Sequence, residues 1–254
     1  MRVFAGPNGS GKSTIINSVR EHKINGVPID FGIYVNADLI LQTLLSESLD
    51  FSDYELEVSE VDFIRIARDS GLINNAFTDL DFRSSFQISG NSLKLLNNNH
   101  GDRIAQIIAD FLRKKLLQEK KKFSFETVFS HPSKIQIMEE AKAEGYKVYL
   151  YFVSTEDPEI NRFRVKEVRV KQGGHDVPED KIVSRYYRSL ELMYDAAQVS
   201  YQAYFFDNSE DGQPSRRVAH FKLLKGKKKW DPIDTQKGLP GWFIKYYLDK
   251  VSVK

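Results

Sequence analysis

The chain has 254 residues, 41% of them hydrophobic, so it is long enough for one large domain that buries its own core. It has no cysteine, which excludes disulfide bonds and thiolate metal sites and fits a reducing compartment. Its 37 Lys and Arg residues nearly balance 35 Asp and Glu, so a nucleic-acid partner is not expected. The chain contains no apolar run long enough to predict a membrane span or a leader peptide, so we expect a cytoplasmic protein.

The first segment, RVFA at 2–5, is a short apolar run and predicts a buried strand. It leads into GPNGSGKS at 6–13, which matches the full G-x-x-x-x-G-K-[ST] pattern of phosphate loops. An amphipathic helix is predicted over 12–23. A strand before this pattern and a helix after it form the context in which it binds phosphate.

Each part of the loop is suited to holding a nucleoside triphosphate. Its glycines let the backbone turn N–H groups inward, and the helix that follows adds its positive end. We expect Lys12 to bridge the β- and γ-phosphates, Ser13 to bind Mg²⁺ and Thr14 to contact the α-phosphate. ATP is expected rather than GTP, since the chain lacks an N-K-x-D tetrapeptide. The expected nucleotide-binding residues here are Gly6, Pro7, Asn8, Gly9, Ser10, Gly11, Lys12, Ser13 and Thr14.

A second strand is predicted within 31–40, with a turn at 36–38, and a helical pattern follows at 40–48. The stretch 77–101 alternates enough for a β-hairpin or an irregular arm, with turns at 89–91 and 97–101. We interpret about 46–100 as an insertion, because strands and helices resume their alternation after it.

The second half alternates between helices and strands. The predicted elements are a helix at 102–121, a strand at 123–129, a helix at 132–145 that stops at Gly145, a strand at 147–154, two charged helices separated at Gly173–Gly174, and a strand at 202–209. This order predicts an α/β fold with a parallel sheet and helices on both faces.

The predicted organisation is a P-loop kinase-like domain at 1–215, with the insertion, and a basic extension at 216–254 packed on it. Four lysines between 225 and 229 predict a solvated turn, which we prefer to a phosphate- or nucleic-acid-binding role. The segment 242–248 predicts a packed terminal helix.

Two carboxylates are candidates for handling the group that accepts phosphate. Asp38 follows the second strand at the edge where open parallel sheets bind ligands, although it could instead cap the next helix. Glu126 lies in a mainly apolar strand, where a carboxylate needs a partner or a ligand. A structural ion pair is the alternative for Glu126.

Several segments together resemble the zeta toxin family of P-loop kinases. They are AGPNGSGKST, VNADLI, FSFETVFS, KQGGHDVPEDKIVSRYYRSL and FFDNS, in this order, and the resemblance spans about 2–45 and 103–209. It implies a P-loop NTPase kinase fold with ATP and Mg²⁺ as cofactors. It does not extend to the insertion or to the tail.

The resemblance also implies roles for individual residues. Asp38 corresponds to the aspartate that activates the acceptor hydroxyl, while Asn36, Glu126, Thr127 and Arg164 would bind the acceptor. Arg169 and Arg185 would stabilise charge on the phosphoryl group in transit, together with Lys12 as a catalytic residue. For the lid arginines, including Arg162, surface ion pairs with Glu159, Glu167 or Glu179 are the alternative.

Two further lid and base positions follow from the same resemblance. Asn208, in DNS after the last strand, would face the base of the nucleotide. His175 stands where these toxins carry a second lid arginine, and Gly173–Gly174 suit a bend in the lid.

The expected function is ATP-dependent phosphorylation of a hydroxyl on a small acceptor, with UDP-N-acetylglucosamine or a related UDP-amino sugar as the named candidate. Two alternatives stay open: a kinase for a nucleoside, an antibiotic or a polynucleotide end, and an ATP-binding regulatory protein that transfers nothing. The resemblance implies a small helical antitoxin as a protein partner.

Overall fold

The computed structural model describes residues 1–169, 177–233 and 238–252, with the backbone alone at 168–169. The chain forms two compact units, the first from Met1–Phe31 and Glu126–Lys254, the second from Gly32–Phe125. This division follows neither the boundary predicted after residue 215 nor the insertion predicted at 46–100. Those domain boundaries stay a prediction.

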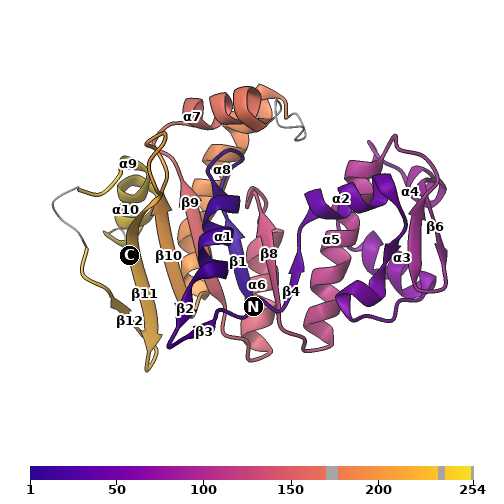
Figure 1. The fold of residues 1–254 in the computed structure, drawn as a ribbon, viewed down its shortest axis with the longest axis horizontal. Coiled ribbons are helices and arrows are strands. Elements are labelled where there is room, and N and C mark those ends of the chain that lie inside the picture. Colours follow the sequence, from indigo (N-terminus) through magenta and orange to yellow (C-terminus); the bar gives the residue numbers. More distant parts are fainter. Residues whose placement is uncertain (170–176, 234–237, 253–254) are drawn as a thin grey trace. The chain divides into compact units, whose positions relative to one another are not determined.

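The first unit combines a sheet with helices and is drawn in Figure 1. Its strands are β1 (Arg2–Ala5), β2 (Lys23–Ile24), β3 (Val27–Pro28), β9 (Tyr149–Ser154), β10 (Gln202–Asp207), β11 (Arg216–Leu224) and β12 (Lys227–Trp230). Its helices are α1 (Lys12–Glu21), α6 (Ser133–Ala143), α7 (Pro158–Phe163), α8 (Glu179–Val199), α9 (Gly241–Phe243) and α10 (Asp249–Ser252), with π-helical turns η2 (Arg164–Arg169) and η3 (Ile244–Leu248).

The sheet of the first unit has the order β12-β11-β10-β9-β1. β1, β9 and β10 are parallel, whereas β11 and β12 are antiparallel additions at one edge. Helices flank the sheet, with α1 in front of it and α8 behind it in Figure 1. The predicted α/β class with a mostly parallel sheet is confirmed.

This arrangement determines where the site forms. The carboxyl ends of parallel strands meet at one edge of a sheet, and ligands of open α/β sheets bind there. The loops after β1, β9 and β10 therefore converge: residues 6–11, 155–157 and 208–209.

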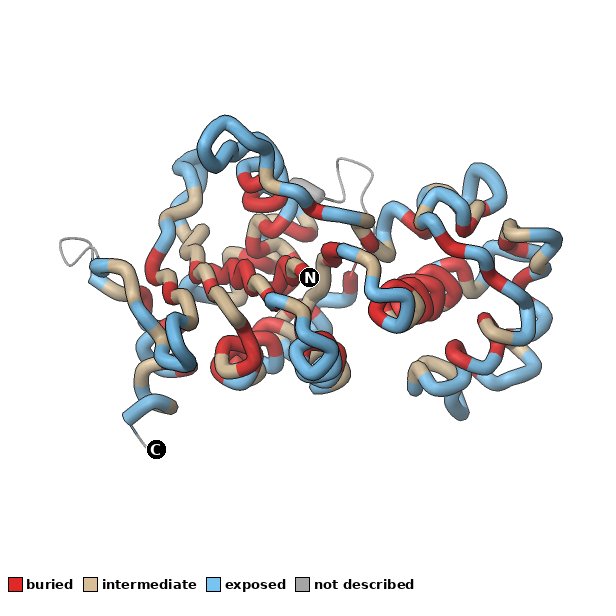
Figure 2. Tube along the Cα trace, turned by 90° about the horizontal axis from the view of Figure 1, so that it is seen from below, coloured by how far each residue is buried: buried red, intermediate tan, exposed pale blue. Residues whose placement is uncertain are grey.

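The second unit contains β4 (Ile33–Val35), α2 (Ala37–Ser46), β5 (Leu49–Asp50), a 3-10 turn η1 (Phe51–Tyr54), α3 (Glu60–Arg68), α4 (Asp79–Ser85), β6 (Phe86–Ser89), β7 (Ser92–Leu95), α5 (Gly101–Gln118) and most of β8 (Phe123–Thr127). β4 pairs with β8 in parallel, and β5-β7-β6 form a small antiparallel sheet. Figure 2 shows α5 buried along most of its length, since its apolar stripe faces α2 and α3.

The core of this unit is a cluster of phenylalanine rings. Their centroids lie 4.9–6.1 Å apart, with edge and tilted contacts that aromatic pairs prefer. The cluster consists of Phe51, Phe63, Phe82, Phe86 and Phe111.

Two local predictions need correction. The arm predicted over 77–101 does end in a hairpin, β6–β7, but 79–85 is the helix α4, because Thr78 and Asp81 form a reciprocal capping box. The four lysines do not form a turn together. Only Lys225 lies in the β11–β12 turn, and the other three lie in the edge strand β12, where lysines discourage pairing with other chains.

No helix in residues 1–169, 177–233 or 238–252 is long and apolar enough to cross a bilayer.

Candidate nucleotide-binding site

The loop between β1 and α1 takes the backbone shape that a phosphate loop requires. Gly9 and Gly11 have φ angles of 74° and 92°, in the left-handed region that favours glycine. A side chain at either position would also collide with its neighbours. A Cβ on Gly9 would lie 2.6 Å from the Asn161 carbonyl, and one on Gly11 would lie 2.2 Å from Asn208 Nδ2. The loop is therefore packed closely against the segments that follow β9 and β10.

Two polar side chains of the loop are buried and unsatisfied. Asn8 and Ser10 are 6% and 0% exposed, and within the described ranges neither Asn8 Oδ1 nor Ser10 Oγ has a hydrogen-bond partner. Buried polar atoms without a partner cost free energy, so such atoms in a native loop call for an explanation. A bound ligand would supply the missing partners.

Lys12 is buried and meets a carboxylate from another strand. Its Nζ donates to the Pro7 carbonyl over 2.9 Å and lies 3.8 Å from Glu126 Oε1. Lys12 begins α1, and Glu126 lies near the end of β8, so two distant segments of the first unit bring these charges together. The ion pair that was the alternative for Glu126 is present, and its partner is the lysine of the phosphate loop.

The remaining predicted residues of the loop and of β8 have separate places. Ser13 and Thr14 are exposed in the first turn of α1. Thr127 follows Glu126, and its Oγ1 accepts from the Phe129 N–H over 3.1 Å, which holds the left-handed turn at Phe129.

The donor set fits Mg²⁺. In phosphate sites this ion takes few protein ligands, because phosphate oxygens and water supply the others, and the exposed Ser13 hydroxyl suits such a place. Within the part of the chain that the structure describes, no group of three or more His, Asp or Glu side chains could hold a metal alone.

The lid arginines differ from one another. Arg162 pairs with Glu159 and with Glu179, the latter at 2.9 Å, as the surface-ion-pair alternative predicted. Arg164 donates to Asp211 and, over 2.7 Å, to the Asn208 carbonyl.

Arg185 is unlike these two. It is half-buried on α8, and in the described residues no carboxylate pairs with its guanidinium. Burial, followed by the nearby Arg188 charge, lowers the pKa of Arg185. A desolvated cation without an anion is suited to binding one.

Four residues predicted for the lid cannot be placed. The side chain of Arg169, and Gly173–Gly174 and His175 entirely, lie outside the described residues.

Asn36 and Asp38 belong to the second unit. Asn36 caps α2, because its Oδ1 accepts from the Asp38 and Leu39 N–H groups over 2.8 and 3.2 Å. Asp38 is exposed in the first turn of that helix. The helix cap that was the alternative for Asp38 is thus made by Asn36 instead.

Asn208 and Asn161 hold the phosphate loop through hydrogen bonds to its backbone carbonyls. Asn208 Nδ2 donates to the Ser10 carbonyl over 2.9 Å, and its Oδ1 accepts from Ser215. Asn161 Nδ2 donates to the Asn8 carbonyl over 2.5 Å. Asn161 could not be singled out from the sequence, since a single asparagine in a charged helix carries no signal of burial.

Comparison with known proteins gives a consistent answer on the fold. No protein-family model matches the chain. An uncharacterized protein of Haemophilus influenzae is 42% identical over 64 residues, which is 25% of this chain and 45% of that protein. A chain of the AvrRxo1-ORF1:AvrRxo1-ORF2 complex, solved with sulphate ions, matches 93% of this chain at TM-score 0.54 and 14% identity. The chain shares that fold.

A second structure of that complex, solved with ATP, matches at TM-score 0.53 and 14% identity. The chain spans about three fifths of the length of these matched chains, and less than half of the Haemophilus protein. The P-loop fold expected from the resemblance to the zeta toxin family is confirmed.

Proposed function

We propose that the chain is a zeta-toxin-like kinase that transfers the γ-phosphoryl group of ATP to an alcohol. The observation that carries this proposal is the meeting of Lys12 with Glu126, 3.8 Å apart at the mouth of a glycine-rich loop. A carboxylate beside the phosphate site gives the second ligand, the acceptor, a group to bind.

ATP is supported as the donor by three features. Gly9 and Gly11 give the loop left-handed backbone angles, Asn8 and Ser10 offer unsatisfied buried polar atoms, and the related fold of the AvrRxo1 complex was solved with ATP. Mg²⁺, held by Ser13 and by phosphate oxygens, would supply further neutralisation of charge when bound.

The residues of this chain would divide the reaction as follows. Lys12 binds the β- and γ-phosphates, and Arg185, with Arg169, stabilises the equatorial oxygens of the transferring group. Asp38 takes the hydroxyl proton as the acceptor oxygen bonds to the γ-phosphorus and the bond to the β-phosphate oxygen breaks. The products are ADP, the phosphorylated alcohol and one proton.

The acceptor is proposed to be UDP-N-acetylglucosamine or a related UDP-amino sugar, phosphorylated on the sugar 3′-hydroxyl. Asn36, Glu126, Thr127 and Arg164 are its proposed binding residues, and Glu126 suits a hydroxyl donor because carboxylate oxygens accept hydrogen bonds. Because the AvrRxo1 structures contain two proteins in complex, we also propose that an antitoxin-like protein binds this chain.

Labelled phosphate transfer tests the proposal directly. The purified protein is incubated with γ-labelled ATP, Mg²⁺ and UDP-N-acetylglucosamine, and then with fractionated cell metabolites. Asp38→Asn should abolish labelling and leave ATP binding intact. Asp53→Asn, at another exposed aspartate of the same unit, is the matched control. ATP binding without a labelled acceptor in any fraction would contradict a small-molecule kinase.

A further inference from the structure

We propose that the affinity of the phosphate loop for its nucleotide is controlled by a clamp of two asparagines, which is held in place by the start of the one-turn helix α9, at 240–242. Asn161 and Asn208 would be positioning residues, since they touch the loop rather than the nucleotide. The inference rests on the proposed nucleotide site and adds to it a means of regulation.

Asn161 forms the first arm of the clamp. It is fully buried, donates from Nδ2 to the Asn8 carbonyl and accepts at Oδ1 from the Thr155 hydroxyl. The Tyr186 hydroxyl, on α8, donates to the Thr155 carbonyl over 2.7 Å. Both ends of the Asn161 amide are therefore occupied, and its direction is fixed.

Asn208 forms the second arm. Its side chain joins the Ser10 carbonyl to the Ser215 hydroxyl, over 2.9 and 3.0 Å. Its own N–H donates to the Ser154 carbonyl, and its carbonyl accepts from Arg164. Four hydrogen bonds hold this residue.

The clamp acts on the loop through the planarity of the peptide bond. In a trans peptide the C=O and the following N–H point in opposite directions. When the Asn8 carbonyl points to Asn161, the Gly9 N–H points away from the clamp. The same holds for Ser10 and Gly11 with Asn208. The two arms thus keep two backbone donors turned toward the side on which phosphate would bind, before any nucleotide arrives.

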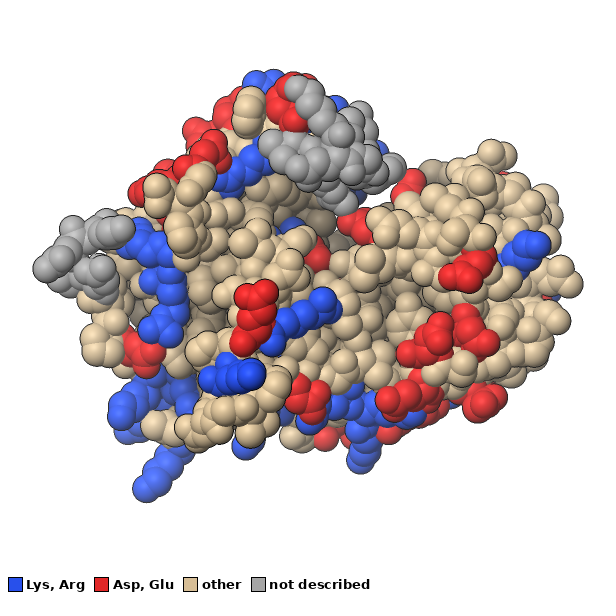
Figure 3. Space-filling model, in the orientation of Figure 1, with Lys and Arg blue, Asp and Glu red and all other residues tan. Residues whose placement is uncertain are grey.

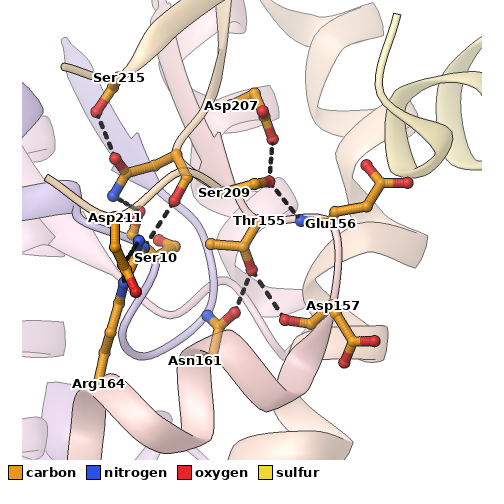
Figure 4. A network of polar contacts seen from close by, with 11 residues as sticks. Ser10, Thr155, Glu156, Asp157, Asn161, Arg164, Asp207, Ser209, Asp211 and Ser215 are labelled. Carbon is orange, nitrogen blue, oxygen red and sulfur yellow. Dashed lines mark hydrogen bonds and ion pairs between the residues drawn. The ribbon is translucent and has the colours of Figure 1, made fainter. Parts of the chain in front are cut away.

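A ring of hydrogen bonds fastens the two arms to the C-terminal part of the chain. The Trp242 indole donates to Asp207 over 3.0 Å, and the Ser209 hydroxyl donates to the same carboxylate oxygen over 2.7 Å. Ser209 accepts from the Glu156 N–H, and the Glu156 carboxylate accepts from the Gly241 N–H over 2.9 Å. Figure 4 shows Ser209 between Asp207 and Glu156.

The ring is placed where it reaches both arms. Asp207 and Ser209 flank Asn208 in the chain, and Glu156 follows Thr155, which holds Asn161. A movement at 240–242, caused by a partner or by a ligand on that turn, would therefore change the direction of both amides together.

The first test replaces the arms. Asn161→Leu and Asn208→Leu keep a similar volume and remove the donor, and each should raise the Kd for ATP at least tenfold. The control is Asn91→Leu: in the second unit Asn91 donates to the Leu56 carbonyl and accepts from the Val58 N–H. It should lower the melting temperature and leave the Kd within twofold.

The second test replaces the fastening. Trp242→Phe keeps a ring in the core and removes the indole donor, and should raise the Kd about threefold or more. Trp230→Phe is the matched control, because in the described ranges the Trp230 indole N–H makes no hydrogen bond. A folded Trp242→Phe protein with unchanged affinity would overturn the role of the turn.

A measurement without nucleotide separates this inference from the proposed function. Hydrogen exchange of the apo protein, followed on a peptide covering 6–14, should be faster in Asn208→Leu and Trp242→Phe than in Asn91→Leu and Trp230→Phe. Equal exchange in all four would overturn the clamp even if ATP binds. Failure of the wild-type protein to bind ATP, with the exchange difference present, would overturn the proposed function alone.

Discussion

The surroundings of the phosphate loop in the first unit and the phenylalanine cluster of the second unit bury different chemistry. Around its loop the first unit buries polar side chains: Asn8, Ser10, Lys12, Ser154, Thr155 and Asn161 are each less than 9% exposed. The second unit is built around five phenylalanine rings. The lysine-rich hairpin β11–β12 is a third environment, in which cations lie mostly at the surface; Figure 3 shows Lys and Arg side chains gathered there.

This difference distinguishes the side chains that stabilise the fold from those that we expect to serve its function. Burying an aromatic ring lowers the free energy of the folded state, whereas burying a polar group raises it unless a partner is found. The phenylalanine cluster thus needs no explanation beyond stability. The polar shell of the loop is explained by the ligand that we propose and by the clamp that shapes the loop.

The largest effect on activity should come from the buried polar side chains around the loop. Lys12→Met keeps the length of the side chain and removes its charge, so phosphoryl transfer should fall by a factor of about a thousand or more. The melting temperature should change by only a few degrees. Lys142→Met, at an exposed position of α6, is the control and should alter neither. Transfer within tenfold of wild type would remove Lys12 from the proposed machinery.

The phenylalanine cluster should show the opposite behaviour. Phe63→Ala removes a ring that is 0% exposed and touches all four other rings of the cluster, so the free energy of unfolding should fall by about 3–5 kcal/mol. Urea denaturation of the full chain measures this. Val61→Ala, on the same helix at a side chain 76% exposed, should stay within about 0.5 kcal/mol. Equal midpoints for the two variants would show that the cluster is not the core.

Glu126 combines the two roles that this comparison separates, because it pairs with Lys12 and is also a proposed ligand of the acceptor. If it holds the acceptor, Glu126→Gln should raise the KM for the acceptor about tenfold and leave the KM for ATP unchanged. If it serves only to neutralise Lys12, the same variant should tighten ATP binding, because a carboxylate 3.8 Å from the ammonium competes with the phosphates. Separate KM values for the two substrates distinguish these results.

The lid arginines give a smaller effect and a paired control. Arg185→Ala should lower kcat about 10- to 100-fold, since a half-buried cation without a carboxylate partner among the described residues is removed. It should also leave the protein equally stable or slightly more stable, because an uncompensated desolvation cost disappears. Arg162→Ala loses only exposed ion pairs and should change kcat less than twofold. Equal kcat for the two variants would contradict the proposed role of Arg185.

Much of the fold could be predicted from periodicity. The strands near 2–5, 149–154 and 202–207 and the helices near 12–21 and 101–118 follow from apolar runs and stripes that local sequence contains. The helix α4 was missed because its stability depends on one capping box, formed by two polar residues in a segment that otherwise alternates.

The residues of the site also divide into those that local sequence predicts and those that it does not. The loop is formed by consecutive residues, so its shape could be predicted. Glu126 could also be singled out, because it is a carboxylate in an apolar strand. The contacts of Glu126 with Lys12 and of Asn161 with Asn8 could not be predicted, because the two residues of each pair are more than a hundred positions apart in the chain. Asn208 was singled out for the base of the nucleotide, yet both ends of its side chain bond within the protein, and a role at the base stays a prediction.

The smallest expected effect concerns Lys228, a half-buried cation outside the proposed site. Lys228, in β12, donates to Gln198 and Tyr247, and burial lowers its pKa to about 8. An unfolded lysine titrates near pH 10.4, so between about pH 8 and 10.5 the unfolded state binds more protons and stability rises with pH. Lys228→Met removes this titration. The free energy of unfolding of wild type should therefore rise relative to the variant across that window.

Solvent screening keeps this rise small, under about 1 kcal/mol, because the side chain is only half-buried. Urea midpoints at pH 7, 8.5 and 10 measure it, with Lys227→Met, at an exposed neighbour on the same strand, as the control. A difference between wild type and Lys228→Met that does not change with pH would show that Lys228 is hydrated. Lys228 would then carry no measurable cost of burial, unlike Lys12 in the loop, for which we propose that a ligand accounts.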